Sequence, residues 1–245
     1  FSAQLSGRTV DRATPSGDPW NNLPIARSCP TDDLDLAFAP VWQLGQWLRK
    51  REVTSKHLTQ LSLSRLKQFN PKLNCVITLT EDLAMKQAEL ADRELDAGQW
   101  RGPLHGVPWG AKDIIDTAGI GTTWGAAAYK DRVPNEDAFV VKQLQRAGAV
   151  LVAKLAVGAL AYGDIWFGGT CKNPFDPEEG SSGSSAGSAS ATAAGLIPFT
   201  LGTETYGSIV SPCMRCGATG LRPTFGRVAR NGVMALCWTL DKIGP

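Results

Sequence analysis

The stretch GSSGSSAGSASATAAGLIPFTLGTETYGSIVS, residues 180–211, decides both the fold and the candidate site of this chain. Its serines and glycines form two small-residue loops on either side of an apolar run. Loops with so little side chain let backbone N–H groups approach a ligand closely. Serine hydroxyls then lie beside those N–H groups without bulky neighbours. The stretch suits either anion binding or attack on a carbonyl, and the rest of the chain has to decide between them.

The apolar pattern around this stretch predicts alternating helices and strands. Within it we expect a tightly packed helix over 186–195 and a strand over 197–203. Before it, helical spacing of apolar residues and a Thr54-Ser55 cap predict helices, and β-rich runs predict strands. The expected helices begin near 41, run from 55 to about 70, and cover 82–97 and 137–147, and the expected strands cover 75–80, 104–113 and 150–155. This alternation predicts an α/β fold, a mixed β-sheet covered by helices.

Composition bounds the organisation of the chain. The 245 residues are enough for a large core, and 43% of them are hydrophobic, which is typical of a globular protein. Residues 1–35 are rich in Pro, Ser, Asp and Gly, so we expect an irregular lead-in, and the rest is long enough for one large α/β domain or two small ones. A net charge of +2 argues against nucleic acid as a direct partner, and no apolar run reaches transmembrane length.

Six scattered cysteines are too sparse for a disulfide scaffold of this size. Cys213 and Cys216 form a lone CxxC, but a zinc site needs a second ligand pair and none is near. We therefore expect buried structural cysteines, no metal and no cofactor. The cysteine usage favours a reducing compartment, and we expect the protein to be cytoplasmic.

Three interpretations of the Gly/Ser stretch fail on context. Gly183 to Gly187 fits the G-x-S-x-G elbow centred on Ser185, but that elbow needs a later histidine, and both histidines, His57 and His105, lie upstream. A phosphate-binding loop would need Gly-Lys-Ser/Thr at its end. A flexible linker would not continue into an apolar strand.

Hydrolysis by serine without histidine remains, and some other base must then accept the serine proton. Lys112 is the natural candidate because it lies in an apolar extended segment, Gly106-Val-Pro-Trp-Gly-Ala-Lys112-Asp113. Burial there would lower the pKa of the amine and favour its neutral form. For the other polar residues we expect structural roles: a hydrogen bond for His105, a solvated helix position for His57 and a local pair or cap for Asp113.

These residues resemble the amidase signature family of serine amidohydrolases over about 36–245. The match rests on segments in the family's order: GVPWGAKD, the Gly/Ser signature from Ser182 to Ser188, GTETYGSI around Ser208, LRPTFGRV and LDKIGP. The resemblance implies that Ser208 is the nucleophile, Ser184 the bridging serine and Lys112 the base. It also implies a cis peptide bond before Ser184.

The implied mechanism passes the Ser208 proton through Ser184 to neutral Lys112, which then protonates the leaving amine. The turn before Ser208 would supply an oxyanion hole from the backbone N–H groups of Thr205, Tyr206 and Gly207.

The chain departs from the family pattern at three positions of this turn. Glu204 replaces an Asp, Tyr206 replaces a Gly and Val210 replaces an Arg. We expect the Tyr206 ring to narrow the acyl pocket, and the missing Arg removes a fixed cation near the loop. The family is also longer than this chain, so we expect an N-terminal portion that lacks the C-terminal part.

The sequence thus predicts an amidase that hydrolyses a carboxylic amide to an acid and ammonia or an amine through a Ser208 acyl-enzyme. Two alternatives stay open: the glutamine-hydrolysing A subunit of an aminoacyl-tRNA amidotransferase, and a catalytically silent member that only binds. The expected partners are a small-molecule amide and either a second copy or partner subunits, with no membrane.

Overall fold

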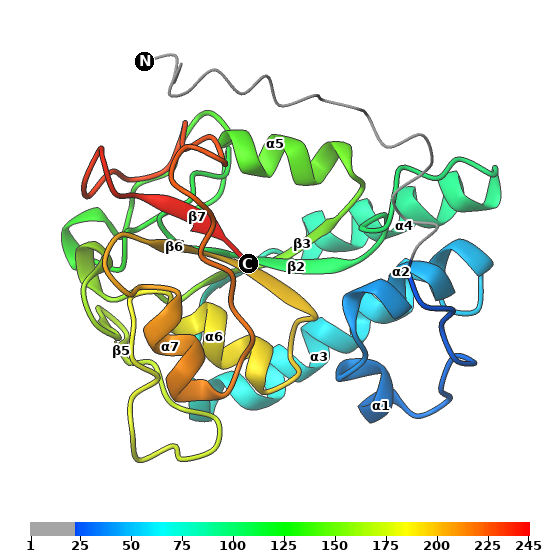
Figure 1. The fold of residues 1–245 in the computed structure, drawn as a ribbon, viewed down its shortest axis with the longest axis horizontal. Coiled ribbons are helices and arrows are strands. Elements are labelled where there is room, and N and C mark those ends of the chain that lie inside the picture. Colours follow the sequence, from blue (N-terminus) through cyan, green and yellow to red (C-terminus); the bar gives the residue numbers. More distant parts are fainter. Residues whose placement is uncertain (1–22) are drawn as a thin grey trace, which may run out of the picture.

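The structure is a computed structural model that describes residues 23–245, and its centre is a five-stranded sheet (Figure 1). The strand order is β1 (Val76–Leu79), β3 (Val150–Leu155), β2 (Pro108–Lys112), β6 (Phe199–Glu204) and β7 (Lys242–Gly244). Strand β2 pairs in parallel with β3 and β6, whereas β1 and β7 pair antiparallel with β3 and β6. The predicted mixed sheet is therefore confirmed.

Helices cover the sheet on both sides. Figure 1 shows α5 on one side and α3, α6 and α7 on the other. The helices are α1 (Asp33–Ala37), α2 (Val41–Lys50), α3 (Ser55–Leu73), α4 (Glu81–Asp96), α5 (Phe139–Arg146), α6 (Ala186–Ala193) and α7 (Val210–Cys216), with short 3₁₀ turns η2 (Ala127–Tyr129) and η3 (Ala159–Ala161) and a small hairpin of β4 (Ile165–Trp166) and β5 (Gly169–Thr170).

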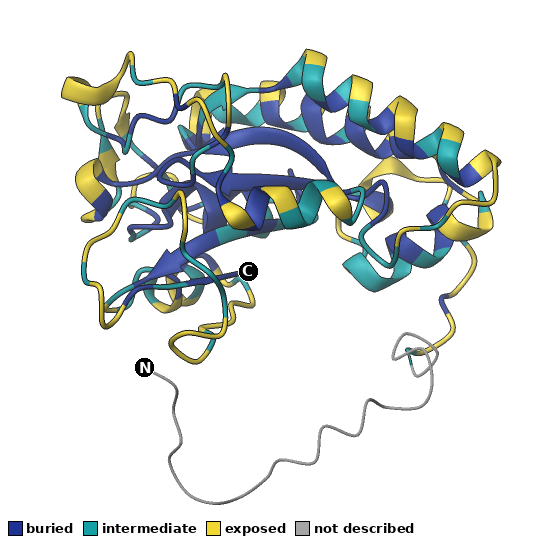
Figure 2. Cartoon of the chain, turned by 90° about the horizontal axis from the view of Figure 1, so that it is seen from above, coloured by how far each residue is buried: buried dark blue, intermediate teal, exposed yellow. Residues whose placement is uncertain are grey.

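The core lies between these layers because β2 and β3 bury every residue along their length, as Figure 2 shows in dark blue. Such continuous burial is typical of central strands covered on both faces. On the α5 side, Val141 packs with Trp109 and Leu151, and Trp109 stacks on Phe199 with ring centroids 6.5 Å apart. The sheet is thus a rigid platform for whatever its strand ends carry.

One helix ends later than the sequence predicts. The expected stop near Asn70-Pro71 is wrong, because α3 continues through Pro71 to Leu73 and ends at Asn74 in the left-handed region (φ 49°). A proline in the last turn removes one helical hydrogen bond, and the Asn74 N–H still reaches the Asn70 carbonyl at 2.8 Å. The Asn70 side chain accepts the N–H groups of Cys75 and Val76, which links the helix to β1.

The sequence pattern misses α7, which carries both cysteines of the CxxC motif. The turn 205–209 joins β6 to this helix and places Ser208 between them. Of the expected lead-in over 1–35, residues 1–22 lie outside the described part. The described remainder contains the start of α1, where the Asp32 side chain caps Leu34 N–H at 3.0 Å.

Candidate active site

Lys112 is the last residue of β2, and its side chain is fully buried. Burial lowers the pKa of its amine well below the ordinary value of 10.5, and the negative charges of Glu204 and Asp241 offset part of this effect. The strand thus delivers a lysine whose neutral form is favoured, as the sequence predicts.

Three hydroxyl groups surround the Lys112 amine. Its Nζ lies 2.8 Å from Ser184 Oγ, 3.0 Å from Ser185 Oγ and 2.7 Å from Thr203 Oγ1. The candidate base and the candidate bridging serine are therefore in direct contact. Thr203 is a site residue that the sequence analysis misses. The pairing of β2 with β6 would have found it, because parallel strands in this register bring the end of β2 beside 202–203.

The Ser185 hydroxyl is already committed to the backbone of β6. Ser185 Oγ donates to the Thr203 carbonyl at 3.2 Å and accepts the Thr203 N–H at 3.1 Å. Since a hydroxyl has one proton, Ser185 can only accept from Lys112. A neutral amine has two N–H donors and one lone pair, so this contact leaves the lone pair to be shared between Ser184 and Thr203.

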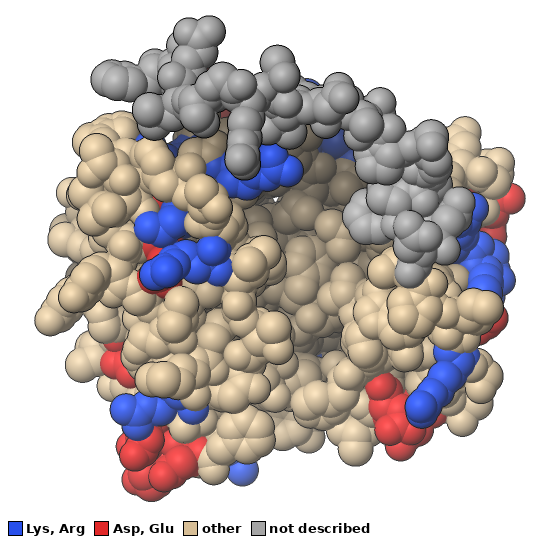
Figure 3. Space-filling model, in the orientation of Figure 1, with Lys and Arg blue, Asp and Glu red and all other residues tan. Residues whose placement is uncertain are grey.

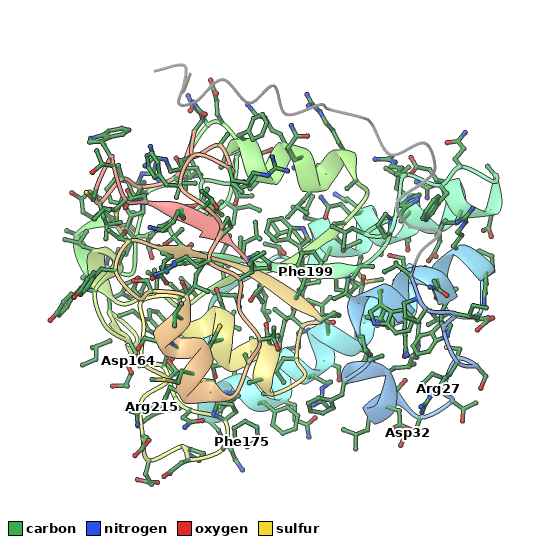
Figure 4. All side chains as sticks on the ribbon, viewed as in Figure 1. Arg27, Asp32, Asp164, Phe175, Phe199 and Arg215 are labelled. Carbon is green, nitrogen blue, oxygen red and sulfur yellow. The ribbon has the colours of Figure 1, made fainter. Side chains whose placement is uncertain are left out.

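The Gly/Ser loop before α6 has unusual backbone geometry. The Gly183–Ser184 peptide bond is cis, as the resemblance implies, and Ser182 is left-handed (φ 61°). A side chain at Gly183 would collide with the Gly163 carbonyl oxygen, 1.9 Å from the position of its Cβ. Asp164, labelled in Figure 4, accepts the Ser182 N–H at 2.9 Å. The Ser182 hydroxyl bonds Ser211 at 2.7 Å, so Lys112 contacts Ser184 and not Ser182.

Ser208 lies half-buried on the turn between β6 and α7. Its carbonyl accepts the Ser185 N–H at 3.0 Å, which joins the nucleophile turn to the loop that carries Ser184. Its hydroxyl makes no hydrogen bond within residues 23–245. Hydrogen bonds of a catalytic group are often loose before substrate binds.

The glutamate before this turn binds its backbone. The Glu204 carboxylate is buried and accepts N–H groups from Gly207, from Ile209 at 2.5 Å and from Val210 at 3.1 Å. Of the three predicted oxyanion donors, Gly207 is thus engaged by Glu204. Tyr206 is 96% exposed, and the effect of its ring on an acyl pocket stays a prediction.

The polar residues expected to be structural have local partners. His105 is buried, accepts the Arg101 N–H at 3.2 Å and lies 3.0 Å from Glu94. Asp113 accepts from Thr123 and pairs with Lys154 at 3.0 Å, and both ionic side chains are fully buried. His57 is exposed and lies 2.8 Å from Asp33.

A groove of about 470 Å³ runs beside the site, between α1 and α6. Its walls include Phe38, Ala189, Phe199 and Pro245, and Figure 3 shows a hollow with few charged side chains at this place. Ser185 borders the groove, whereas Lys112, Ser184 and Ser208 do not line it. The groove is therefore adjacent to the hydroxyl cluster and does not contain it.

Other site types receive little support from residues 23–245. They hold no cluster of three or more His, Cys, Asp or Glu side chains that could bind a metal. None of their helices is long and apolar enough to span a membrane. The cysteines are free, and the prediction that they are buried is confirmed for Cys75, Cys171 and Cys216 but wrong for Cys29, Cys213 and Cys237, which are partly exposed.

Comparison with known proteins agrees with this geometry. The chain is 43% identical over 206 residues to the A subunit of the Coxiella burnetii glutamyl-tRNA(Gln) amidotransferase. The matched region covers 83% of this chain and 42% of that protein. The native peptide amidase of Stenotrophomonas maltophilia has a similar structure, with 36% identity, a TM-score of 0.77 and coverage of 84% of this chain and 44% of that one. A solved fatty acid amide hydrolase matches with 26% identity and a TM-score of 0.79 over 84% of this chain and 37% of its own.

The chain spans less than half the length of each of these relatives. The family model for amidases matches residues 57–245, which include all the hydroxyls around Lys112 and the turn with Ser208. The chain therefore belongs to the amidase family.

Proposed function

We propose that this chain carries the catalytic centre of an amidase, with Ser208 as nucleophile, Ser184 as proton bridge and Lys112 as base. The observation that carries this proposal is a fully buried lysine whose amine touches three hydroxyls and, among residues 23–245, no carboxylate. A lysine placed to form an ion pair would have a carboxylate at this distance. A neutral amine among hydroxyls is a proton acceptor that serine chemistry can use.

In the proposed acylation step, Ser208 Oγ forms a bond to the amide carbon and releases its proton toward Ser184. Ser184 passes its own proton to the Lys112 lone pair. The resulting ammonium has three N–H donors, which match the three surrounding hydroxyls. The cluster thus accommodates the charge that forms during the reaction without a permanent counter-ion in contact.

Collapse of the tetrahedral intermediate then breaks the C–N bond. The leaving nitrogen takes a proton back along the same path, from Lys112 through Ser184. Water attacks the Ser208 ester and releases the carboxylic acid. Backbone N–H groups of the turn, Thr205 and Tyr206 among the predicted donors, would hold the oxyanion, each worth about 3–4 kcal/mol.

Labelling with a fluorophosphonate tests this proposal. Ser208 should attack phosphorus, release fluoride and form an adduct that peptide mass spectrometry locates at residue 208. Ser208→Ala should abolish the adduct, and Lys112→Met should slow its formation by at least about 100-fold. Ser64→Ala, at an exposed position of helix α3, is the matched control and should label at the wild-type rate. Unlabelled wild-type protein that also lacks amidase activity on simple carboxamides would favour the binding-only alternative.

A second candidate function rests on the similarity to the A subunits of glutamyl-tRNA(Gln) amidotransferases. In this case the same site hydrolyses glutamine and works with other proteins of a complex. Ammonia release from glutamine that increases with a co-purifying partner would support it. Release from simple carboxamides, unchanged by added partner and absent with glutamine, would support the stand-alone amidase. We favour the amidase because Val210 replaces the arginine that the family pattern has in the nucleophile loop and the net charge is only +2.

A further inference from the structure

The Glu204 side chain, just before the nucleophile turn, accepts three backbone N–H groups around Ser208. The residue ends β6, and its side chain is fully buried. Its Oε1 accepts the Gly207 N–H, and its Oε2 accepts the N–H groups of Ile209 and Val210. One carboxylate therefore binds the backbone immediately before Ser208 and the two residues immediately after it.

This arrangement divides the backbone donors of the turn into two groups. The N–H groups of Gly207, Ile209 and Val210 point to Glu204. Within residues 23–245, the N–H groups of Thr205, Tyr206 and Ser208 have no hydrogen-bond acceptor. Thr205 and Ser208 are half-buried, and Tyr206 is exposed. A carbonyl oxygen beside Ser208 would therefore meet donors that nothing else occupies.

Other contacts hold the same turn from outside. The Ser208 carbonyl accepts from Ser185, and the Gly207 carbonyl accepts the Ser211 N–H at 2.7 Å. Gly207 has φ +106°, a conformation that residues other than glycine rarely adopt. The turn is thus held by its carbonyl groups on one side and by Glu204 through its N–H groups on the other.

We propose that Glu204 is a positioning residue that fixes the Ser208 turn and leaves the Thr205, Tyr206 and Ser208 N–H groups available to the substrate oxygen. The inference rests on the proposed function, because it gives Glu204 a role in that same reaction. Glu204 touches no reacting atom. It acts through the backbone it binds and through its negative charge near Lys112.

Charge and reach are both needed for this role. A glutamine at 204 would still offer one oxygen, but its NH₂ group would face a backbone N–H donor. An aspartate would keep the charge but be shorter by one methylene, so it could not reach all three N–H groups from the same Cα. We expect Glu204→Gln to lower the Ser208 labelling rate and kcat by about 100-fold, and Glu204→Asp by about 10-fold, with KM little changed.

The pH profile separates positioning from a merely structural role. The charged groups that act on Lys112 are Glu204 at the end of β6 and Asp241 before β7, and both favour its protonated form. Removing the charge at 204 should move the acidic limb of kcat/KM to lower pH, whereas Glu204→Asp should leave it near its wild-type position. A variant that merely lowers the fraction of folded protein would reduce kcat/KM at every pH without shifting its acidic limb.

The experiment compares the two Glu204 variants with Glu178→Gln, an exposed carboxylate change, and with wild type. It measures fluorophosphonate labelling, kcat and KM across pH, with the folded fraction from circular dichroism. A Glu204→Gln variant with the wild-type labelling rate and an unshifted acidic limb of kcat/KM would overturn the inference while the proposed function stands. If Glu204→Gln does not fold, Glu204→Asp decides, and wild-type labelling there would overturn it. Absent labelling in wild type would overturn both proposals.

Discussion

Asp113 and Lys154 form a buried ion pair, and substitutions at the two positions should have strongly non-additive effects on the free energy of unfolding. Their charged atoms lie 3.0 Å apart, and both side chains are fully buried. Asp113 also accepts the N–H and hydroxyl of Thr123 at 2.7 and 2.6 Å. Lys154 also contacts the Thr122 hydroxyl at 2.6 Å. Each charge has neutral partners besides the other, but within residues 23–245 it is in direct contact with only one opposite charge.

The expected cost follows from which charge is left alone. Asp113→Asn leaves an ammonium among neutral groups, and breaking a buried pair in this way costs about 3–5 kcal/mol of unfolding free energy. Lys154→Met leaves a carboxylate that still has both Thr123 donors, so it should lie at the lower end of that range. The double variant buries no charge, and it should be less destabilised than the sum of the single variants by at least about 2 kcal/mol.

The pH dependence of Asp113→Asn provides an independent check. Burial lowers the pKa of Lys154, and Asp113 opposes that effect. Without Asp113 the folded-state pKa falls further below the unfolded value, so between the two values the unfolded chain binds more protons. The unfolding free energy of the variant should therefore rise with pH in that window.

Urea unfolding of wild type, both single variants and the double variant at several pH values measures these quantities. Additivity of the two single effects within about 0.5 kcal/mol would refute the reasoning, because it would mean that the charges do not depend on each other. Activity is the control. Asp113 and its neighbour Lys112 contact separate sets of residues, so folded variants should keep most of their turnover.

Four further predictions follow from the site and its surroundings. Because the proposed mechanism uses the neutral Lys112 amine and burial lowers its pKa, kcat/KM should rise with pH through an acidic limb well below 10.5, measured by a pH–rate profile. Ser182→Ala and Ser185→Ala should lose less kcat than Ser184→Ala, because Ser182 bonds Ser211 and Ser185 only accepts from Lys112; equal losses in all three would show that the bridge is misassigned. Thr203→Val, which keeps the shape and removes the hydroxyl, should lower kcat by about 10-fold in a steady-state assay, and an unchanged kcat would limit the cluster to two working hydroxyls. Gly148→Ala should destabilise the fold by about 1–3 kcal/mol in urea unfolding, because the residue has φ +77° and a Cβ would lie 2.4 Å from the His105 ring, whereas Gly98→Ala shares the left-handed φ without a neighbour and should cost less.

Much of the fold could be predicted because its central elements repeat one pattern. The apolar run of β3 and the stripe of α3 each favour one structure; β3 forms where expected, and α3 differs only in its end at Leu73. Helix α7 could not be predicted because its seven residues include a proline and two cysteines, and few of them are buried. Its position is set by tertiary contact with α6 and by the turn that Glu204 holds.

In the candidate site, residues carried by a local motif could also be predicted, whereas residues placed by tertiary contacts could not. Lys112 and Ser184 could be identified because short motifs carry them. Thr203 and the orientation of Ser185 depend on strand pairing, which no local pattern reveals. The exposure of Tyr206 also depends on how the turn leaves the sheet, which no local pattern shows.

The departures at 204, 206 and 210 make one coherent arrangement and do not by themselves indicate a silent site. The cation lost at Val210 is not needed to satisfy the acidic residue, because Glu204 takes its partners from the backbone, including the N–H of Val210 itself. A valine supplies that N–H as well as an arginine would. Arg222 places a guanidinium nitrogen 3.9 Å from the same carboxylate, so a positive charge remains near the turn. In the proposed mechanism Tyr206 contributes its backbone N–H, and its side chain is exposed in the described part of the chain. The three departures therefore leave the backbone that holds Ser208 supported by a carboxylate, as the hydrogen bonds of Glu204 show.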